Sequence, residues 1–257
     1  MKNTLLEILE ILSIDITNQC HKECPFCYNS SASAKTGRWS GDEVVEFAAD
    51  CIGHGVKAVS LGGGEPFEHP EIFSIISSLY PLAYLTVTTN GLPLLNEGVQ
   101  SRLKEVHPDK IHISIHNPDN QNEVQRVISQ LRWLASIGVT PGVNLLVSDR
   151  TVVMAHDVYR QLSEVLSPRQ IIILPMRYGN TPAPQDLYKV AGSQPFQSSS
   201  CLTGCRRPAN FASVTWDKKA SPCSFTPAKA KLAELTYRSL VDALDSVEFI
   251  DCSKMMG

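Results

Sequence analysis

Residues 20–28 read CHKECPFCY and hold three cysteines, Cys20, Cys24 and Cys27, separated by three and then by two other residues. Just before them, residues 12–17 (LSIDIT) alternate along the chain and are rich in β-branched side chains, which predicts a buried strand. The cysteines therefore follow the carboxyl end of a strand. In a β/α barrel, the loops at that end carry the active site.

Three thiolates on one short loop suit a cuboidal 4Fe-4S cluster, because three irons are then held by protein and the fourth stays open. A closed structural metal site usually has four protein ligands. Phe26 and Tyr28, on either side of Cys27, would give such a cluster a partly apolar cover. The spacing alone leaves two alternatives open, a zinc site and one half of a disulfide set.

The pattern Cys-x3-Cys-x2-Cys, with an aromatic residue before the last cysteine, resembles the radical S-adenosylmethionine (SAM) enzymes. Two further matches follow in the expected order: GGGEP at residues 62–66, after the apolar run 58–61, and TTNG at residues 88–91, after the run 84–87. Consecutive glycines let a backbone approach a ligand closely, and their carbonyls can accept hydrogen bonds from an ammonium group.

The resemblance implies that the open iron binds SAM and that one-electron reduction cleaves SAM to a 5′-deoxyadenosyl radical. It also implies a one-electron donor such as flavodoxin or ferredoxin. The residues that it assigns to SAM are Tyr28, Gly62, Gly63, Gly64, Glu65, Pro66, Thr89, Asn90, Ser114, Asn144 and Met176.

Strand and helix patterns alternate along the first 180 residues. Period-two or apolar runs predict strands at 12–17, 58–61, 82–88, 111–116, 143–147 and 170–174, with helical patterns between them. Ser40 and Glu43 have the spacing of a capping box, and Cys51 falls on the apolar stripe of the helix that follows, so we expect Cys51 in the core. Six such repeats predict an α/β fold with a parallel sheet and match the partial (β/α)6 TIM-like barrel of the resembled family.

Polar residues at the ends of the later strands are candidates for contact with SAM or substrate. Ser114 and His116 end the fourth strand, Asn144 interrupts the apolar fifth, and Met176 follows the sixth. We assign His116, Arg177 and Tyr178 to catalysis or substrate binding. His112 shares a strand face with His116, and we interpret His112 as a core histidine.

The composition changes after residue 180, where Pro and Ser become frequent. We therefore divide the chain into a barrel at 1–180, a mobile loop over the mouth of the active site at 181–200, and a small cysteine-rich module at 201–257. The module reads as a hairpin that turns at residues 217–219, followed by a helix at about 232–247. It carries four cysteines, the number that a closed 4Fe-4S cluster needs: Cys201, Cys205, Cys223 and Cys252.

This module resembles the twitch domain, a short relative of the SPASM domain, which holds one auxiliary 4Fe-4S cluster. Cys205, Cys223 and Cys252 match the order of that family's ligands. Cys201 departs from the order, because the family commonly ends in Cys-x2-Cys and Met255 stands where the second cysteine would fall. Either Cys201 is the fourth ligand or one iron is open to substrate, and a structural zinc site is the alternative.

The whole sequence has 257 residues, a formal net charge of −3 and eight cysteines. The charge gives no sign of a nucleic-acid partner. No apolar run reaches membrane-spanning length, and residues 5–10 are too short and too acidic for a signal peptide, so we expect no membrane partner and a cytoplasmic protein. Cysteines in such a protein point to metal or redox chemistry.

For function, we predict a radical SAM enzyme in which an auxiliary cluster exchanges an electron with the substrate radical. Such an arrangement favours oxidation or crosslinking, with a ribosomally made peptide as the substrate and recognition supplied by a separate protein. The alternatives are dehydrogenation of a small molecule, such as an aminocyclitol or sugar, and a non-catalytic iron-sulfur redox or sensing protein.

Overall fold

The computed structural model describes residues 9–177, 179–192, 196 and 210–248. Four of the residues assigned above lie outside the described residues: Tyr178, Cys201, Cys205 and Cys252. The chain forms two compact units, one of residues 1–109 with 207–250 and one of residues 110–206 with 251–257.

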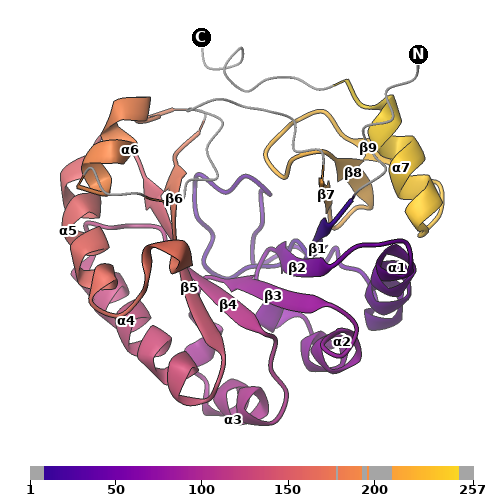
Figure 1. Ribbon diagram of the computed structural model, residues 1–257, viewed down its shortest axis with the longest axis horizontal. Helices are drawn as coiled ribbons and strands as arrows, with labels where there is room; N and C mark the ends of the chain where they lie inside the picture. Colours follow the sequence, from indigo (N-terminus) through magenta and orange to yellow (C-terminus); the bar gives the residue numbers. More distant parts are fainter. Residues whose placement is uncertain (1–8, 178, 193–195, 197–209, 249–257) are drawn as a thin grey trace. The chain divides into compact units, whose positions relative to one another are not determined.

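The first unit begins with three parallel strands, β1 (Ile11–Thr17), β2 (Ala58–Gly63) and β3 (Tyr84–Thr89), drawn in indigo to purple in Figure 1. Helices α1 (Gly41–Gly53), α2 (Ile72–Leu79) and α3 (Glu97–Glu105) alternate with them, together with 3-10 turns at Pro66–Glu68 and Pro93–Leu95. The period-two pattern of β1 is confirmed, since Leu12, Ile14 and Ile16 are fully buried. Burying these side chains between the strands and helices forms the core that holds the loops at the strand ends.

Helix α1 starts as the sequence predicts. The Ser40 hydroxyl accepts from the Glu43 N–H at 3.2 Å, and the Glu43 carboxylate accepts from the Ser40 N–H at 2.9 Å, which completes the capping box. Cys51 lies on the buried stripe of this helix and is fully covered, as expected. Burial raises the pKa of its thiol to about 12, so Cys51 behaves as a small apolar residue.

The predicted hairpin is also confirmed and joins the sheet of the first unit. Strand β7 (Phe211–Val214) pairs with β8 (Lys219–Ser221) in antiparallel fashion, and β9 (Ala230–Lys231) pairs with β8. Strand β7 pairs in parallel with β1, Leu12 opposite Ala212 and Ile14 opposite Val214, so the order in this unit is β3-β2-β1-β7-β8-β9. The sequence predicted the hairpin but not this pairing.

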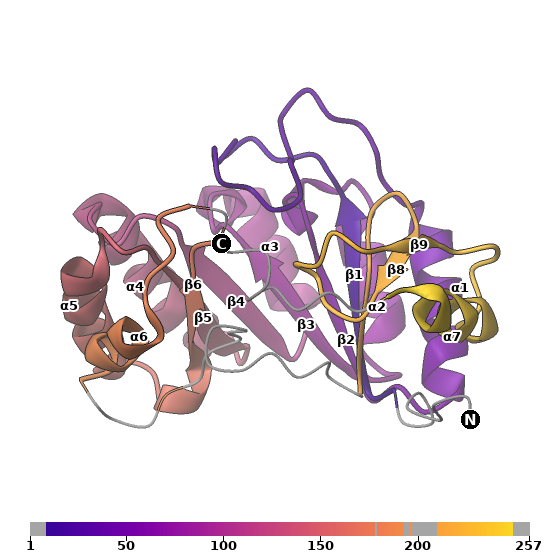
Figure 2. The same ribbon diagram turned by 90° about the horizontal axis from the view of Figure 1, so that it is seen from above.

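Helix α7 (Tyr237–Ser246) starts later than the expected residue 232, because the Thr236 hydroxyl caps it by accepting from the Ser239 N–H at 3.2 Å. Figures 1 and 2 both place α7 beside α1. The Tyr237 N–H donates to Asp50 Oδ2 at 2.6 Å, and the Tyr237 and His54 rings stack. The segment after the hairpin is therefore part of the same packed unit as β1.

The second unit has three parallel strands in the order β6-β5-β4: β4 (Lys110–Ile115), β5 (Thr140–Val147) and β6 (Ile171–Pro175). The helices α4 (Gln121–Ser136) and α5 (Val152–Ser163) follow β4 and β5, and a 3-10 turn at Pro168–Gln170 precedes β6. The apolar stripe predicted for α4 is buried, as Val124, Val127 and Leu134 show.

One expectation is wrong here. The stretch 181–200, predicted to be a mobile loop, contains helix α6 (Pro184–Val190). Pro184 occupies the first turn, where a proline costs nothing, and the Asp186 carboxylate accepts from the Ala183 N–H at 3.1 Å. Leu187 and Val190, three residues apart, are fully buried. A pattern of two apolar residues is too short to stand out from a Pro-rich background.

The predicted fold class, a mixed α/β fold with parallel strands and additional C-terminal strands, is confirmed. The proposed domain limits stay a prediction. Among the helices of the described residues, none has the length and apolar character that a membrane crossing requires.

Candidate functional site

The loop after β1 carries the three clustered cysteines. Cys20 is buried and Cys24 and Cys27 are half-buried, and no disulfide joins them among the described residues. Two backbone hydrogen bonds hold the loop in shape. The Cys27 N–H donates to the Cys24 carbonyl at 3.1 Å, and the Cys20 N–H donates to the Ala32 carbonyl at 3.2 Å. Glu23 has a positive φ of 48°, and its carboxylate accepts from the Ser33 N–H at 2.9 Å. The loop is thus tied to the chain that follows it.

The glycine segment after β2 lies directly against this loop. The Gly64 N–H donates to the Thr17 carbonyl at 2.6 Å, and the Glu65 N–H to the Gln19 carbonyl at 2.8 Å. A Cβ on Gly64 would stand 2.0 Å from the Gln19 carbonyl oxygen, and one on Gly63, whose φ is +118°, would stand 2.4 Å from that of Thr17. We expected these glycines to admit a ligand, which stays a prediction. The structure shows that Gly63 and Gly64 lie against the backbone at the end of β1 and at the start of the cysteine loop.

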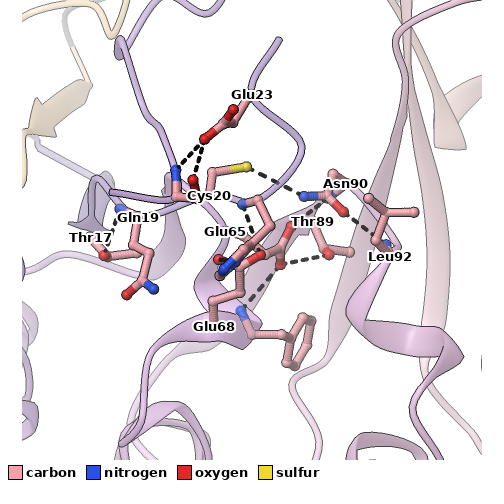
Figure 3. Close-up of polar contacts among 12 residues, drawn as sticks. Thr17, Gln19, Cys20, Glu23, Glu65, Glu68, Thr89, Asn90 and Leu92 are labelled. Carbon is pink, nitrogen blue, oxygen red and sulfur yellow. Dashed lines mark hydrogen bonds and ion pairs between the residues drawn. The ribbon is translucent and has the colours of Figure 1, made fainter. Parts of the chain in front are cut away.

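Glu65 is fully buried and joins the end of β2 to the end of β3 (Figure 3). Its carboxylate accepts from the Thr89 hydroxyl and the Asn90 N–H, both at 2.8 Å, and from the Phe67 N–H at 3.1 Å. Burial raises the pKa of this carboxyl to about 7, while the three donors oppose the shift by favouring the carboxylate. The resemblance assigned Glu65 to SAM, but both of its carboxylate oxygens hold protein groups.

Asn90 completes this arrangement. Its side-chain Nδ2 donates to Cys20 Sγ at 3.6 Å, and its Oδ1 accepts from the Leu92 N–H at 2.8 Å (Figure 3). The structure therefore brings four of the predicted residues together in the first unit: Cys20, Glu65, Thr89 and Asn90.

Sequence reasoning missed two residues of this unit that contact the cysteine loop. Glu68 accepts from the His21 N–H at 3.1 Å, and its other oxygen lies 2.7 Å from His21 Nδ1. Asp15, on β1, is almost fully buried and accepts from the Tyr28 hydroxyl at 3.4 Å. Burial raises the pKa of the Asp15 carboxyl to about 6. A carboxylate inside the buried run LSIDIT was the sequence signal for Asp15.

The residues predicted at the ends of the later strands lie in the second unit. Ser114 and Asn144 are partners in the register of β4 and β5. Burial lowers the pKa of His112 to about 4, so the ring is neutral, in keeping with a core histidine. The His116 N–H donates to Glu123 Oε1 at 2.9 Å, which ties the end of β4 to α4. Met176, followed by Arg177, extends β6 by donating its N–H to the Val147 carbonyl at 2.7 Å.

The cysteine loop fits a 4Fe-4S cluster. Its donors are thiolates, the ligands that such clusters use, and three of them stand on one loop. Among the described residues, no three His, Cys, Asp or Glu side chains are grouped as ligands of one metal ion. In a cuboidal cluster each cysteine binds a different iron, so the three sulfurs need not surround one metal ion. The finding therefore argues against a single-ion site such as zinc among the described residues. Of the four C-terminal cysteines, only Cys223, just after β8, lies within the described residues.

Curated relatives match about half of the chain. The Probable GTP 3′,8-cyclase of Methanocella arvoryzae is 29% identical over 139 residues, 51% of this chain and 45% of the relative. That of Archaeoglobus fulgidus is 26% identical over 156 residues, 57% of this chain and 52% of the relative. The chain thus spans about half the length of these curated relatives.

Solved structures match more of the chain at lower identity. SuiB of Streptococcus suis bound to S-adenosylmethionine has a TM-score of 0.64 and 14% identity, covering 84% of this chain and 60% of SuiB. anSMEcpe with bound AdoMet has a TM-score of 0.63 and 17% identity, covering 92% of this chain and 81% of anSMEcpe. At these identities the similarity concerns the fold alone, and it agrees with the predicted partial barrel.

The relatives correct the predicted function. We expected oxidation or crosslinking of a peptide, but the curated relatives are named as GTP cyclases, so that prediction is wrong. Neither alternative, dehydrogenation of a small molecule or a non-catalytic sensor, agrees with them. The peptide was inferred from the resemblance of the C-terminal cysteines to a domain family, and a resemblance of that kind does not define the shape of a substrate site.

A family model, the Radical SAM superfamily, matches residues 14–166, which include the cysteine loop, the glycine segment and the end of β3. Three separate motifs in this range have the predicted order, and the structure joins them by hydrogen bonds around Glu65. This chain therefore belongs to the radical SAM superfamily.

Proposed function

We propose that Cys20, Cys24 and Cys27 hold a 4Fe-4S cluster and that the chain is a radical SAM enzyme acting on a nucleotide. The observation that carries the radical SAM assignment is the loop of three cysteines, held beside the glycine segment by backbone hydrogen bonds from Gly64 to Thr17 (2.6 Å) and from Glu65 to Gln19 (2.8 Å). When bound, the cluster and SAM together supply a 5′-deoxyadenosyl radical that takes a hydrogen atom from the substrate.

The residues around the loop then have separate tasks. Because Glu65 is occupied by Thr89, Asn90 and Phe67, we assign the SAM ammonium to carbonyl oxygens of Gly62, Gly63 and Gly64. Glu65 and Glu68 hold the backbone of this segment and of the cysteine loop in place. We retain as proposals the other predicted SAM contacts, Tyr28, Pro66, Thr89, Ser114, Asn144 and Met176, and the substrate contacts His116, Arg177 and Tyr178.

We also propose an auxiliary cluster on Cys201, Cys205, Cys223 and Cys252. Its support is the order of these cysteines around the hairpin and the position of Cys223 directly after β8. A low-potential donor such as flavodoxin or ferredoxin would supply the electron.

For the substrate we propose GTP, and for the reaction a radical cyclisation, because the curated relatives are named Probable GTP 3′,8-cyclase. These matches cover 51% and 57% of this chain. The substrate proposal therefore rests on the names of these relatives.

We expect GTP to stimulate SAM cleavage several-fold over the background seen without substrate. The measurement is 5′-deoxyadenosine formation by anaerobically reconstituted protein with dithionite and SAM, with GTP, GDP, ATP or no nucleotide. Cys24→Ala serves as the control and should form none.

Two outcomes would contradict different parts of the proposal. Background cleavage that no nucleotide raises would overturn the nucleotide substrate and leave the radical chemistry standing. A preparation with its full iron content that forms no 5′-deoxyadenosine at all would overturn the enzymatic proposal itself.

A further inference from the structure

The side-chain amide of Asn90 faces the sulfur of a cysteine that we assign to the cluster. Its Nδ2 lies 3.6 Å from Cys20 Sγ, within the range of an N–H···S hydrogen bond. Both residues are buried, Asn90 at 6% exposure and Cys20 at 9%. Water therefore competes little with this contact, and a dipole has a larger effect on a nearby charge in such surroundings than in solvent.

The direction of the amide is fixed by its other end. Asn90 Oδ1 accepts from the Leu92 N–H at 2.8 Å, and a backbone N–H can only donate. Turning the amide over would place the NH2 group against this donor. The oxygen must therefore face Leu92, and the NH2 group must face the sulfur.

The backbone of Asn90 is held as firmly as its side chain. Its N–H donates to Glu65 Oε2 at 2.8 Å, and the neighbouring Thr89 hydroxyl donates to Glu65 Oε1 at 2.8 Å. Glu65 in turn is tied through its own N–H to the Gln19 carbonyl, next to Cys20. The donor and the sulfur thus belong to one hydrogen-bonded frame.

From this geometry we propose that Asn90 is a positioning residue that raises the reduction potential of the SAM-binding cluster through its N–H···S bond to Cys20. Reduction adds negative charge to the cluster and its thiolates, and an N–H dipole aimed at a thiolate stabilises the more negative state. The resemblance assigned Asn90 to SAM, whereas the structure directs its side chain to a cluster ligand. The inference rests on the proposed assignment of Cys20 as that ligand.

The experiment compares reduction potentials of wild type, Asn90→Leu and Thr89→Val in the reconstituted protein without SAM. Leucine has nearly the shape of asparagine but no donor, and it adds no charge. Thr89→Val removes the hydrogen bond to Glu65 and the acceptor of the Gly91 N–H, both in the same segment, and does not alter the Asn90 side chain itself. The electron paramagnetic resonance signal of this cluster is the one that is absent from a Cys20/Cys24/Cys27→Ala variant.

We expect Asn90→Leu to lower the ratio of reduced to oxidised cluster about tenfold at a fixed applied potential. A tenfold change in this ratio corresponds to a reduction potential lower by about 59 mV for one electron. Thr89→Val should stay at the wild-type potential. Equal potentials in all three proteins would overturn the proposal, as would an equal shift in both variants, because the cause would then be a loosened segment.

A second measurement needs only the wild-type protein. With 15N-labelled asparagine, pulsed electron paramagnetic resonance of the reduced cluster should show a coupling to an asparagine nitrogen. The absence of such a coupling would overturn the proposal even if Asn90→Leu failed to assemble. If the Cys20/Cys24/Cys27→Ala variant retained the electron paramagnetic resonance signal, the assignment of Cys20 as a cluster ligand would be wrong. That result differs from a missing asparagine coupling, which would contradict only the role of Asn90.

Discussion

Gly64→Ala is expected to prevent assembly of the SAM-binding cluster. The added Cβ would stand 2.0 Å from the Gln19 carbonyl oxygen and 2.7 Å from its carbon, so it meets backbone, which cannot turn aside as a side chain can. Overpacking costs about 1 to 3 kcal/mol even where neighbours adjust. Here the adjustment would displace the residue before Cys20. The measurement is iron per chain after anaerobic reconstitution.

Gly62→Ala is the matched control. A Cβ on Gly62 meets only Asp15 Oδ1, at 3.4 Å, an ordinary van der Waals contact, and the change has the same size and chemistry. We expect Gly62→Ala to retain its iron. Wild-type iron in Gly64→Ala would show that the close approach of the two backbones does not fix the cysteine loop.

Glu65→Ala should destabilise the protein by about 2 to 3 kcal/mol. The change removes the carboxylate that accepts hydrogen bonds from three donors, the Thr89 hydroxyl and the N–H groups of Asn90 and Phe67. Part of this loss is offset, because the carboxylate itself is costly to bury, as the upward shift of its pKa indicates. The measurement is the free energy of unfolding in urea, with full-length protein under anaerobic conditions.

Two further variants sharpen this test. Glu65→Gln keeps the shape but turns an NH2 group toward one of the donors, so we expect a smaller loss than for alanine. Glu68→Gln changes the carboxylate three residues along, which is partly exposed, and should change the free energy of unfolding by less than about 1 kcal/mol. Equal free energies of unfolding for Glu65→Ala and Glu68→Gln would contradict the claim that the three hydrogen bonds to Glu65 stabilise this part of the protein.

The sequence predicted the elements whose signals are local. The period-two run of β1, the capping box of Ser40 and Glu43 and the hairpin turn each depend on neighbours within a few residues. All three are present, although the turn ends before Lys219, which already belongs to β8. The buried position of Cys51 likewise follows from helical spacing alone.

The contacts that sequence reasoning did not predict join residues far apart in the chain. The pairing of β1 with β7 spans about two hundred residues, and the contact of Asn90 with Cys20 spans seventy. The motifs named Glu65 and Asn90 as candidate site residues, and the structure places both beside the cysteine loop. They did not reveal which groups these side chains bind, because hydrogen-bond direction depends on the distance and angle between elements that only the fold brings together.

The substrate was the least predictable part. The motifs of residues 20–28, 62–66 and 88–91 specify a chemistry that many substrates share, while specificity depends on the surfaces that surround it. The peptide prediction was corrected by curated relatives that are named Probable GTP 3′,8-cyclase.

The most direct test of the central claim is the iron and sulfide content of anaerobically reconstituted protein, measured for wild type beside Cys20/Cys24/Cys27→Ala. We predict that the variant loses about four irons and four sulfides per chain relative to wild type. An auxiliary cluster would leave about four irons in the variant. Equal iron in the two proteins would contradict the assignment of these three cysteines to a 4Fe-4S cluster.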